Sequence, residues 1–76
     1  MKAYLVVTVN SGKSRDVARV ISSLPGVIMA DACWGVGDVF AVLEFSSWSD
    51  LNHVVLEKIH QTPNVIHTET HVAIQD

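Results

Sequence analysis

The sequence predicts an α+β fold in which a four-stranded antiparallel sheet carries two helices on one face. Stretches typical of strands and helices alternate along the 76 residues in the order β-α-β, hairpin, β-α-β. The two halves also repeat, because Pro63 follows Pro25 by 38 residues and Val65 follows Val27 by the same interval. Two copies of a split β-α-β unit form a ferredoxin-like βαββαβ sandwich. We expect residues 1–76 to form one domain of this kind, since compact domains start at about 50 residues.

The first half begins with a strand over residues 3–9, which is rich in valine, leucine and tyrosine. Next comes a helix with one apolar face at helical spacing, formed by Val17, Val20, Ile21 and Leu24. The turn and cap candidates before this helix are Ser11, Gly12 and Ser14, and Leu24-Pro25-Gly26 ends it. A second strand is expected over residues 27–34.

The second half repeats this plan after a tight hairpin at Gly35-Val36-Gly37-Asp38, whose glycines suit positive φ angles. A strand is expected over residues 39–45, then a helix capped by Ser47 or Ser49. The inner face of this helix is expected to contain Leu51, Val54, Val55 and Ile59. Thr62-Pro63-Asn64 ends the helix, and the last strand spans residues 65–74.

The two strands expected at the centre of the sheet are apolar on both faces. Tyr4 and Val6 alternate with the core positions of the first strand, and Phe40 and Val42 do so in the third. The outer strands are more polar: Asp31 interrupts the second, and one face of the fourth carries His67, Glu69 and His71. An apolar face opposite the helices would be a liability in a monomer. We therefore expect self-association through this face, with two-fold symmetry.

Composition narrows the function classes. Lysine and arginine total 5 against 8 acidic residues, so the net charge of −3 does not favour nucleic acid as a partner. The single cysteine, Cys33, cannot form an internal disulfide, which indicates a reducing cytoplasm. The first ten residues are too short and too interrupted for a membrane span or a signal peptide.

Catalytic and metal chemistry find little support in the sequence. Cys33 stands beside Trp34 in an apolar stretch and is expected to be a small buried thiol. His53 and His60 would lie about 10 Å apart along a helix, and His67 and His71 about 13 Å apart along a strand, so neither pair can bind one ion. A pH-sensitive subunit interface is the hypothesis that these histidines allow.

The hairpin is the best candidate for a binding site. Its glycines expose backbone amides that can receive a carboxylate, and Asp38 can accept from an ammonium group, so the pair suits a free α-amino acid. The structural alternative is that the glycines form the turn and Asp38 fixes it. Trp34 and Trp48 are expected to anchor the core or an interface, or one of them to line a ligand pocket. Thr68 and Thr70 place hydroxyl groups on one face of the last strand.

The order and spacing of several short motifs resemble one known family. These are Gly12 before the first helix, Leu24-Pro25-Gly26-Val27, Gly35-x-Gly37-Asp38-Val39, then Leu51, Leu56, Ile59, Thr62-Pro63-x-Val65 and Thr68-x-Thr70. Together they resemble the RAM domain, the effector-binding half of Lrp/AsnC transcription regulators, over the whole chain. The chain starts at the first sensor strand, so we expect a stand-alone module without a DNA-reading element.

The resemblance implies dimers built through the sheets, a dimeric α/β-barrel-type assembly that often extends to rings of dimers. It also implies that a small amino-acid-like effector binds between dimers, and it maps the pocket onto Gly35, Val36, Gly37 and Asp38, with Thr68 and Thr70 as a weaker match. The family often has an aromatic residue where this chain has Gly37, so the resemblance implies either a wider pocket or one that Trp34 lines instead.

We therefore expect a cytoplasmic, non-enzymatic, cofactor-free sensor, able to modulate a full-length regulator by forming mixed oligomers. The alternatives are a small dimeric enzyme of the cofactor-free monooxygenase or isomerase type, and a purely structural interaction module.

Overall fold

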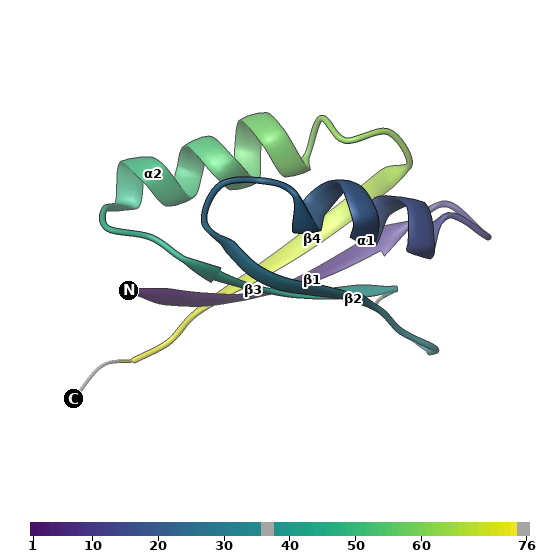
Figure 1. Cartoon of the computed structure of the whole chain (residues 1–76), viewed down its shortest axis with the longest axis horizontal. Coiled ribbons are helices and arrows are strands. Elements are labelled where there is room, and N and C mark those ends of the chain that lie inside the picture. Colours follow the sequence, from purple (N-terminus) through teal and green to yellow (C-terminus); the bar gives the residue numbers. More distant parts are fainter. Residues whose placement is uncertain (36–37, 75–76) are drawn as a thin grey trace.

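The computed structural model describes residues 1–35 and 38–74, and it confirms the expected order of elements. The strands are β1 (Lys2–Val9), β2 (Val27–Ala32), β3 (Val39–Glu44) and β4 (Val65–Val72). They form one antiparallel sheet in the order β2-β3-β1-β4. The helices α1 (Ser14–Ser22) and α2 (Trp48–Asn52), with the continuation of α2, cover one face of this sheet and leave the other open (Figure 1). This is the ferredoxin-like arrangement that the repeat predicts.

Helix α1 differs from its prediction in two details. Ser14 is its first residue rather than its cap, because the cap position is Lys13, which makes no side-chain capping bond. The buried stripe consists of Val17, Ala18 and Ile21, whereas Val20 is exposed. Val17 and Ile21 are thus buried as expected and Leu24 is partly buried against the core, whereas Ala18 is buried in place of Val20, since a short helix on a sheet buries only a narrow stripe.

The second helix begins as predicted and then widens. Ser47 is the cap, because its hydroxyl accepts a bond of 3.1 Å from the amide of Asp50. From His53 to Ile59 the helix continues as a π-helical segment, η1, which ends with the amide of His60 donating to the carbonyl of Val55 at 3.0 Å. Of the expected inner face, Leu51, Val55 and Ile59 are buried and Val54 is half-buried.

The two helix-to-strand turns repeat each other bond for bond. The amide of Val27 donates to Leu24 at 3.2 Å, and the amide of Val65 donates to Thr62 at the same distance. Gly26 and Asn64 occupy equivalent positions, with φ angles of 84° and 75°. The repeat seen in the sequence is therefore also a repeat of backbone conformation.

Each of these turns also fastens one half of the chain to the other. The carbonyl of Gly26 accepts from the amide of Glu44 at 2.7 Å, and the carbonyl of Asn64 accepts from the amide of Asn10 at 2.9 Å. Glu44 and Asn10 lie at the ends of β3 and β1, which lead into the two helices. The two halves are thus joined reciprocally around the core.

The core lies between the sheet and the helices, and the open face carries exposed apolar side chains. The core side of the central strands is buried, and it consists of Ala3, Leu5, Val7, Val9, Val39, Ala41, Leu43 and Phe45. On the opposite face, Tyr4 and Phe40 of the same strands are 45% and 43% exposed, and Met29 of β2 is 45% exposed. The apolar open face expected from strand alternation is therefore present.

The polar residues of β4 also lie where alternation places them. His67, Glu69 and His71 are opposite Thr8, Val6 and Tyr4 of β1, which puts all three on the open face. A pH-sensitive interface at this face stays a prediction. Within residues 1–35 and 38–74, no helix is long and apolar enough to cross a membrane.

Candidate functional site

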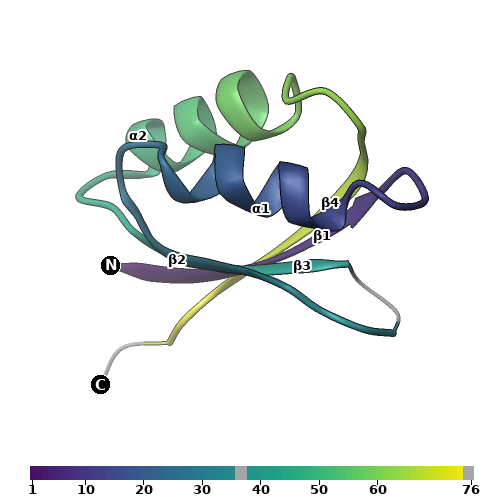
Figure 2. The same ribbon diagram turned by 45° about the vertical axis from the view of Figure 1, so that its right-hand side comes forward.

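The β2–β3 hairpin and the turn between β1 and α1 lie at the same end of the sheet, away from the N-terminus (Figure 2). They border a surface pocket of about 500 Å³. It is lined by residues 9–12, by Ser14 and Arg15 of α1, and by residues 32–35 with Asp38. Residues of the predicted hairpin site thus lie around one cavity with a second loop that is distant in sequence.

Asp38 connects the hairpin to β1. Its carboxylate accepts the amide of Val9 at 3.0 Å, and its own amide donates to the carbonyl of Val7 at 3.0 Å. The carbonyl of Asp38 also accepts the amide of Cys33 at 2.8 Å, which closes the base of the hairpin. The structural role expected for Asp38 is therefore present, and the carboxylate is held in a fixed position beside the pocket.

Gly35 and Trp34 shape the hairpin side of the pocket. Gly35 has a φ of 100°, a conformation that residues with a Cβ rarely adopt, which explains the glycine at this position. Trp34 is 99% exposed, so its expected role as a core anchor is wrong for the single chain. The strand β2 ends at Ala32 rather than at residue 34, and the indole therefore lies on the hairpin outside the sheet. Trp48 is also exposed, and its ring contacts Phe45 with centroids 5.9 Å apart.

The facing loop supplies a cation that sequence reasoning missed. Gly12, with a φ of 79°, allows the chain to turn, and the amide of Lys13 closes this turn on the carbonyl of Asn10 at 3.0 Å. The next residues begin α1, which brings Arg15 to the pocket opposite the hairpin. The only sequence signal was an arginine in the first helical turn after a glycine turn.

The remaining predicted site residues are placed elsewhere. Thr68 and Thr70 pair with Val7 and Leu5, which puts them on the helix-facing side of β4, and neither lines the hairpin pocket. Thr68 bonds instead to the imidazole of His60 at the end of η1. The predicted residues Val36 and Gly37 lie outside the residues that the structure describes.

Cys33 corrects another expectation, since it is half-buried and lines the hairpin pocket instead of lying in the core. Its thiol contacts the carbonyl oxygen of Asp31 at 3.6 Å.

Two of the four histidines lie against carboxylates. His53 contacts Glu57 one turn away on the second helix, and His71 lies 3.9 Å from Glu69 on β4. Among residues 1–35 and 38–74, no group of three histidine, cysteine or acidic side chains is arranged to hold an ion.

The fold and the hairpin pocket together define a small ferredoxin-like α+β domain with a surface pocket at one end of its sheet. A family model described as the Lrp/AsnC ligand binding domain matches residues 2–76, and the chain therefore belongs to this family. Comparison with curated protein sequences gives no match.

Solved structures agree with this assignment. The hypothetical protein PHS023 from Pyrococcus horikoshii superposes with a TM-score of 0.89 at 28% identity, over 99% of this chain and 90% of that one. AsnC from E. coli has a TM-score of 0.89 at 22% identity, over 99% of this chain and 51% of its own. The regulator NMB0573 from Neisseria meningitidis, solved as a complex with L-Met, has a TM-score of 0.84 at 18% identity, over 99% of this chain and 50% of its own. This chain spans about half the length of the last two proteins.

Proposed function

We propose that this chain is an effector-binding and oligomerisation module of the Lrp/AsnC type, and that its hairpin pocket receives a small amino-acid-like ligand between subunits. The observation that carries the proposal is that Arg15 and Asp38 line the same pocket. An α-amino acid carries one negative and one positive group. Arg15 and the backbone of Gly35 suit its carboxylate, and the fixed carboxylate of Asp38 suits its ammonium group.

Exposure of Trp34 supports a site that is completed by another copy of the chain. An indole that is 99% exposed contributes nothing to the packing of its own chain, whereas a buried aromatic side chain contributes strongly to interfaces. We propose that Trp34 closes the pocket against a neighbouring copy or against the side chain of the ligand. The L-Met complex of the Neisseria meningitidis regulator supports this ligand class.

The assembly that we propose forms through the open face of the sheet. Tyr4, Met29 and Phe40 expose apolar area there, and covering it against a second copy would remove that area from water. A dimer of this kind has two-fold symmetry, and rings of dimers would bring hairpin pockets of different dimers together. The same face would permit mixed oligomers with a full-length Lrp/AsnC regulator.

The activity that we propose is regulatory rather than catalytic, and it operates in the cytoplasm without direct contact to nucleic acid. The family model is described as the Lrp/AsnC ligand binding domain, and the structural neighbours include a transcriptional regulatory protein of the AsnC family, PF0864 from Pyrococcus furiosus. A ligand can act in such a module only if it binds one assembly state more tightly than another. The net charge of −3 favours partners other than nucleic acid.

A thermal-shift screen with the twenty amino acids tests the proposal. A ligand selective for the native state stabilises it by about 2.7 kcal/mol at a hundredfold excess over Kd, which raises Tm by several degrees. Arg15→Gln should remove this rise, whereas Arg19→Gln, the same change on the same helix but outside the pocket, should keep it. An unchanged Tm with all twenty amino acids, or an equal response of both variants, would contradict the proposal.

A further inference from the structure

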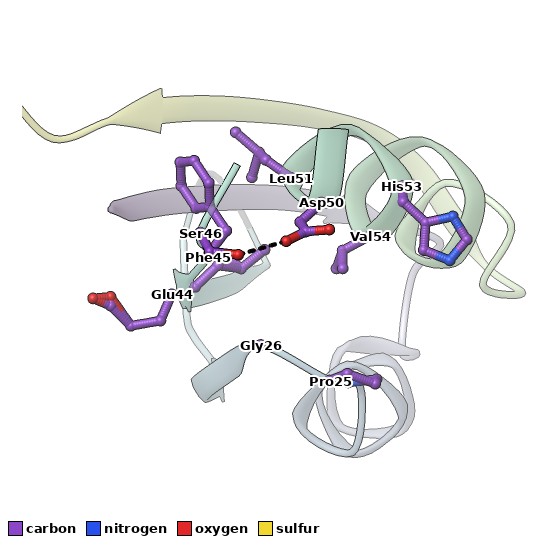
Figure 3. A pocket seen from close by; sticks show the side chains of 10 residues that line it. Pro25, Gly26, Glu44, Phe45, Ser46, Asp50, Leu51, His53 and Val54 are labelled. Carbon is purple, nitrogen blue, oxygen red and sulfur yellow. Dashed lines mark hydrogen bonds between the residues drawn. The ribbon is translucent and has the colours of Figure 1, made fainter. Parts of the chain in front are cut away.

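A second pocket lies at the end of the sheet opposite the hairpin, and the proposed effector site does not use it. It has a volume of about 300 Å³ and opens between the α1–β2 turn and the start of α2. Figure 3 shows Pro25 and Gly26 on one side of this pocket, with Ser46 and Asp50 on the other. Its volume lies at the lower limit of the range of about 300–1,000 Å³ typical of small-molecule sites.

Comparison of the two halves shows why this end of the molecule is open. At the hairpin end, the equivalent turn carries Asn64, whose side chain accepts a bond of 3.2 Å from the side chain of Asn10. At this end the equivalent residue is Gly26, which has no side chain to span the gap toward β3. An added Cβ at Gly26 would also approach the carbonyl of Glu44 to 2.9 Å. A side chain at this position would therefore crowd the end of β3, which borders the pocket.

The inner wall of the pocket is apolar and rigid. Leu43, Phe45 and Leu51 belong to the buried core, so their side chains are fixed by packing from behind. Val54 is half-buried and points into the opening in Figure 3. A compact hydrocarbon group that entered the pocket would cover these carbon atoms.

The polar side of the pocket includes the carboxylate of Asp50, which hydrogen bonds hold in place. The hydroxyl of Ser46 donates to Asp50 at 2.7 Å, and the backbone amide of Asp50 is bonded to Ser47 in the cap of α2. These bonds hold the carboxylate at the rim. Among the described residues, those that line this pocket also include the carboxylate of Glu44 and the imidazole of His53, which contacts Glu57, but no lysine or arginine. A cation is therefore favoured at this rim over an anion.

From this arrangement we infer that the pocket binds a small primary amine with a compact apolar body and no carboxylate. The ammonium group bonds to Asp50, and the apolar body lies on Leu51 and Val54. An α-amino acid is disfavoured, because its carboxylate would lie near those of Asp50 and Glu44 without a lysine or arginine to balance it. The hairpin pocket differs in this respect, since Arg15 lines it. The two pockets thus select different ligand classes.

The test is a titration of the uniformly ¹⁵N-labelled full chain with phenethylamine, followed by amide chemical shifts. We expect saturable shifts at Gly26, Leu51 and Val54, and we expect phenylalanine at equal concentration to leave these three amides in place. Shifts confined to other parts of the molecule, no saturation, or equal shifts with phenylalanine would overturn the inference.

Two variants assign the binding to this pocket. Asp50→Asn should raise the Kd for phenethylamine about tenfold, the loss expected for one charge-assisted hydrogen bond at a partly exposed site. The control Asp16→Asn removes the same charge from α1 outside the pocket and should leave the Kd unchanged. Val54→Trp fills the opening and should abolish the shifts. Circular dichroism confirms that each variant is folded, and a folded Val54→Trp protein that still binds would overturn the inference.

Discussion

At the scale of single residues, Asp38 has one role that is visible in the chain and one that is proposed. Its carboxylate holds the amide of Val9, which ties the hairpin to β1. Asp38→Ala should lower the free energy of unfolding by about 1–2 kcal/mol, since it leaves a partly buried amide without its acceptor. Urea denaturation measures this loss.

Asp38→Asn separates the two roles. An amide oxygen can still accept the bond from Val9, so the free energy of unfolding in urea should stay within about 0.5 kcal/mol of that of the native protein. The negative charge is gone, and the thermal shift caused by an amino-acid effector should therefore disappear. A full effector response in the asparagine variant would show that the charge of Asp38 does not recognise the ligand.

Two glycines permit a separate test of backbone conformation and of close packing. Gly12 and Gly26 both have positive φ angles, but an added Cβ meets nothing within 4 Å at Gly12 and lies 2.9 Å from the carbonyl oxygen of Glu44 at Gly26. Gly12→Ala should cost about 1–2 kcal/mol from the backbone alone. Gly26→Ala should cost at least about 1 kcal/mol more, because the strand end must also move. If chemical denaturation gave equal losses in the free energy of unfolding for the two variants, the close approach of Gly26 to Glu44 would make no contribution to stability.

At the scale of elements, the sequence could indicate some of the residues that line the hairpin pocket but not others. Gly35 and Asp38 were predictable because a hairpin imposes its own local chemistry. Arg15 was not, since its place at the pocket depends on the contact between two loops that are separated along the chain. The expectation that Trp34 anchors the core was wrong because β2 ends at Ala32, two residues earlier than predicted, although Trp34 does line the hairpin pocket.

The last strand offers a prediction about Thr68. Its hydroxyl bonds to His60 and so links β4 to the end of η1. Thr68→Val keeps the shape and removes this bond, so it should lower stability by about 1 kcal/mol and leave the effector response intact. Thermal shifts with and without the effector measure both quantities. A lost response with unchanged stability would show that Thr68 acts in ligand binding instead.

The open face of the sheet and the outer face of α1 provide a matched pair for the assembly. Phe40 and Val20 are 43% and 44% exposed in the single chain, but only Phe40 lies on the open face. Phe40→Glu should dissociate the assembly, because it places a charge in the proposed apolar interface. Val20→Glu should leave it unchanged. Light scattering after size-exclusion chromatography measures the mass of each variant in solution. A native protein found only at the monomer mass of 8.3 kDa would refute the proposed assembly through the open face.

For the whole molecule, the fold was largely predictable because the chain repeats itself. The interval of 38 residues between Pro25 and Pro63 reflects two turns that share hydrogen bonds and left-handed residues. The alternation of side chains along β1 and β3 also predicted the apolar open face correctly. The widened segment η1 could not be predicted, since its sequence has the same apolar periodicity as an α-helix and only tertiary packing selects the wider turn.

Only part of the hairpin pocket could be predicted from the sequence. A site formed by several loops, and completed by neighbouring copies as we propose, depends on distances that no single stretch of residues encodes. The strand order brings the β1–α1 turn next to the hairpin, and the open face would decide how copies meet. Assembly and ligand binding are therefore expected to be coupled properties of this protein.

A crystal structure of the chain, grown with the amino acid that gives the largest thermal shift, tests this coupling of effector binding and assembly. We expect ligand density in the hairpin pocket, with the carboxylate of the ligand at Arg15 and its ammonium group at Asp38. We also expect Trp34 to pack against the ligand or against a neighbouring copy. Density for the ligand away from this pocket, or a ligand enclosed by one chain with no second copy near it, would show that the hairpin is not an intersubunit effector site.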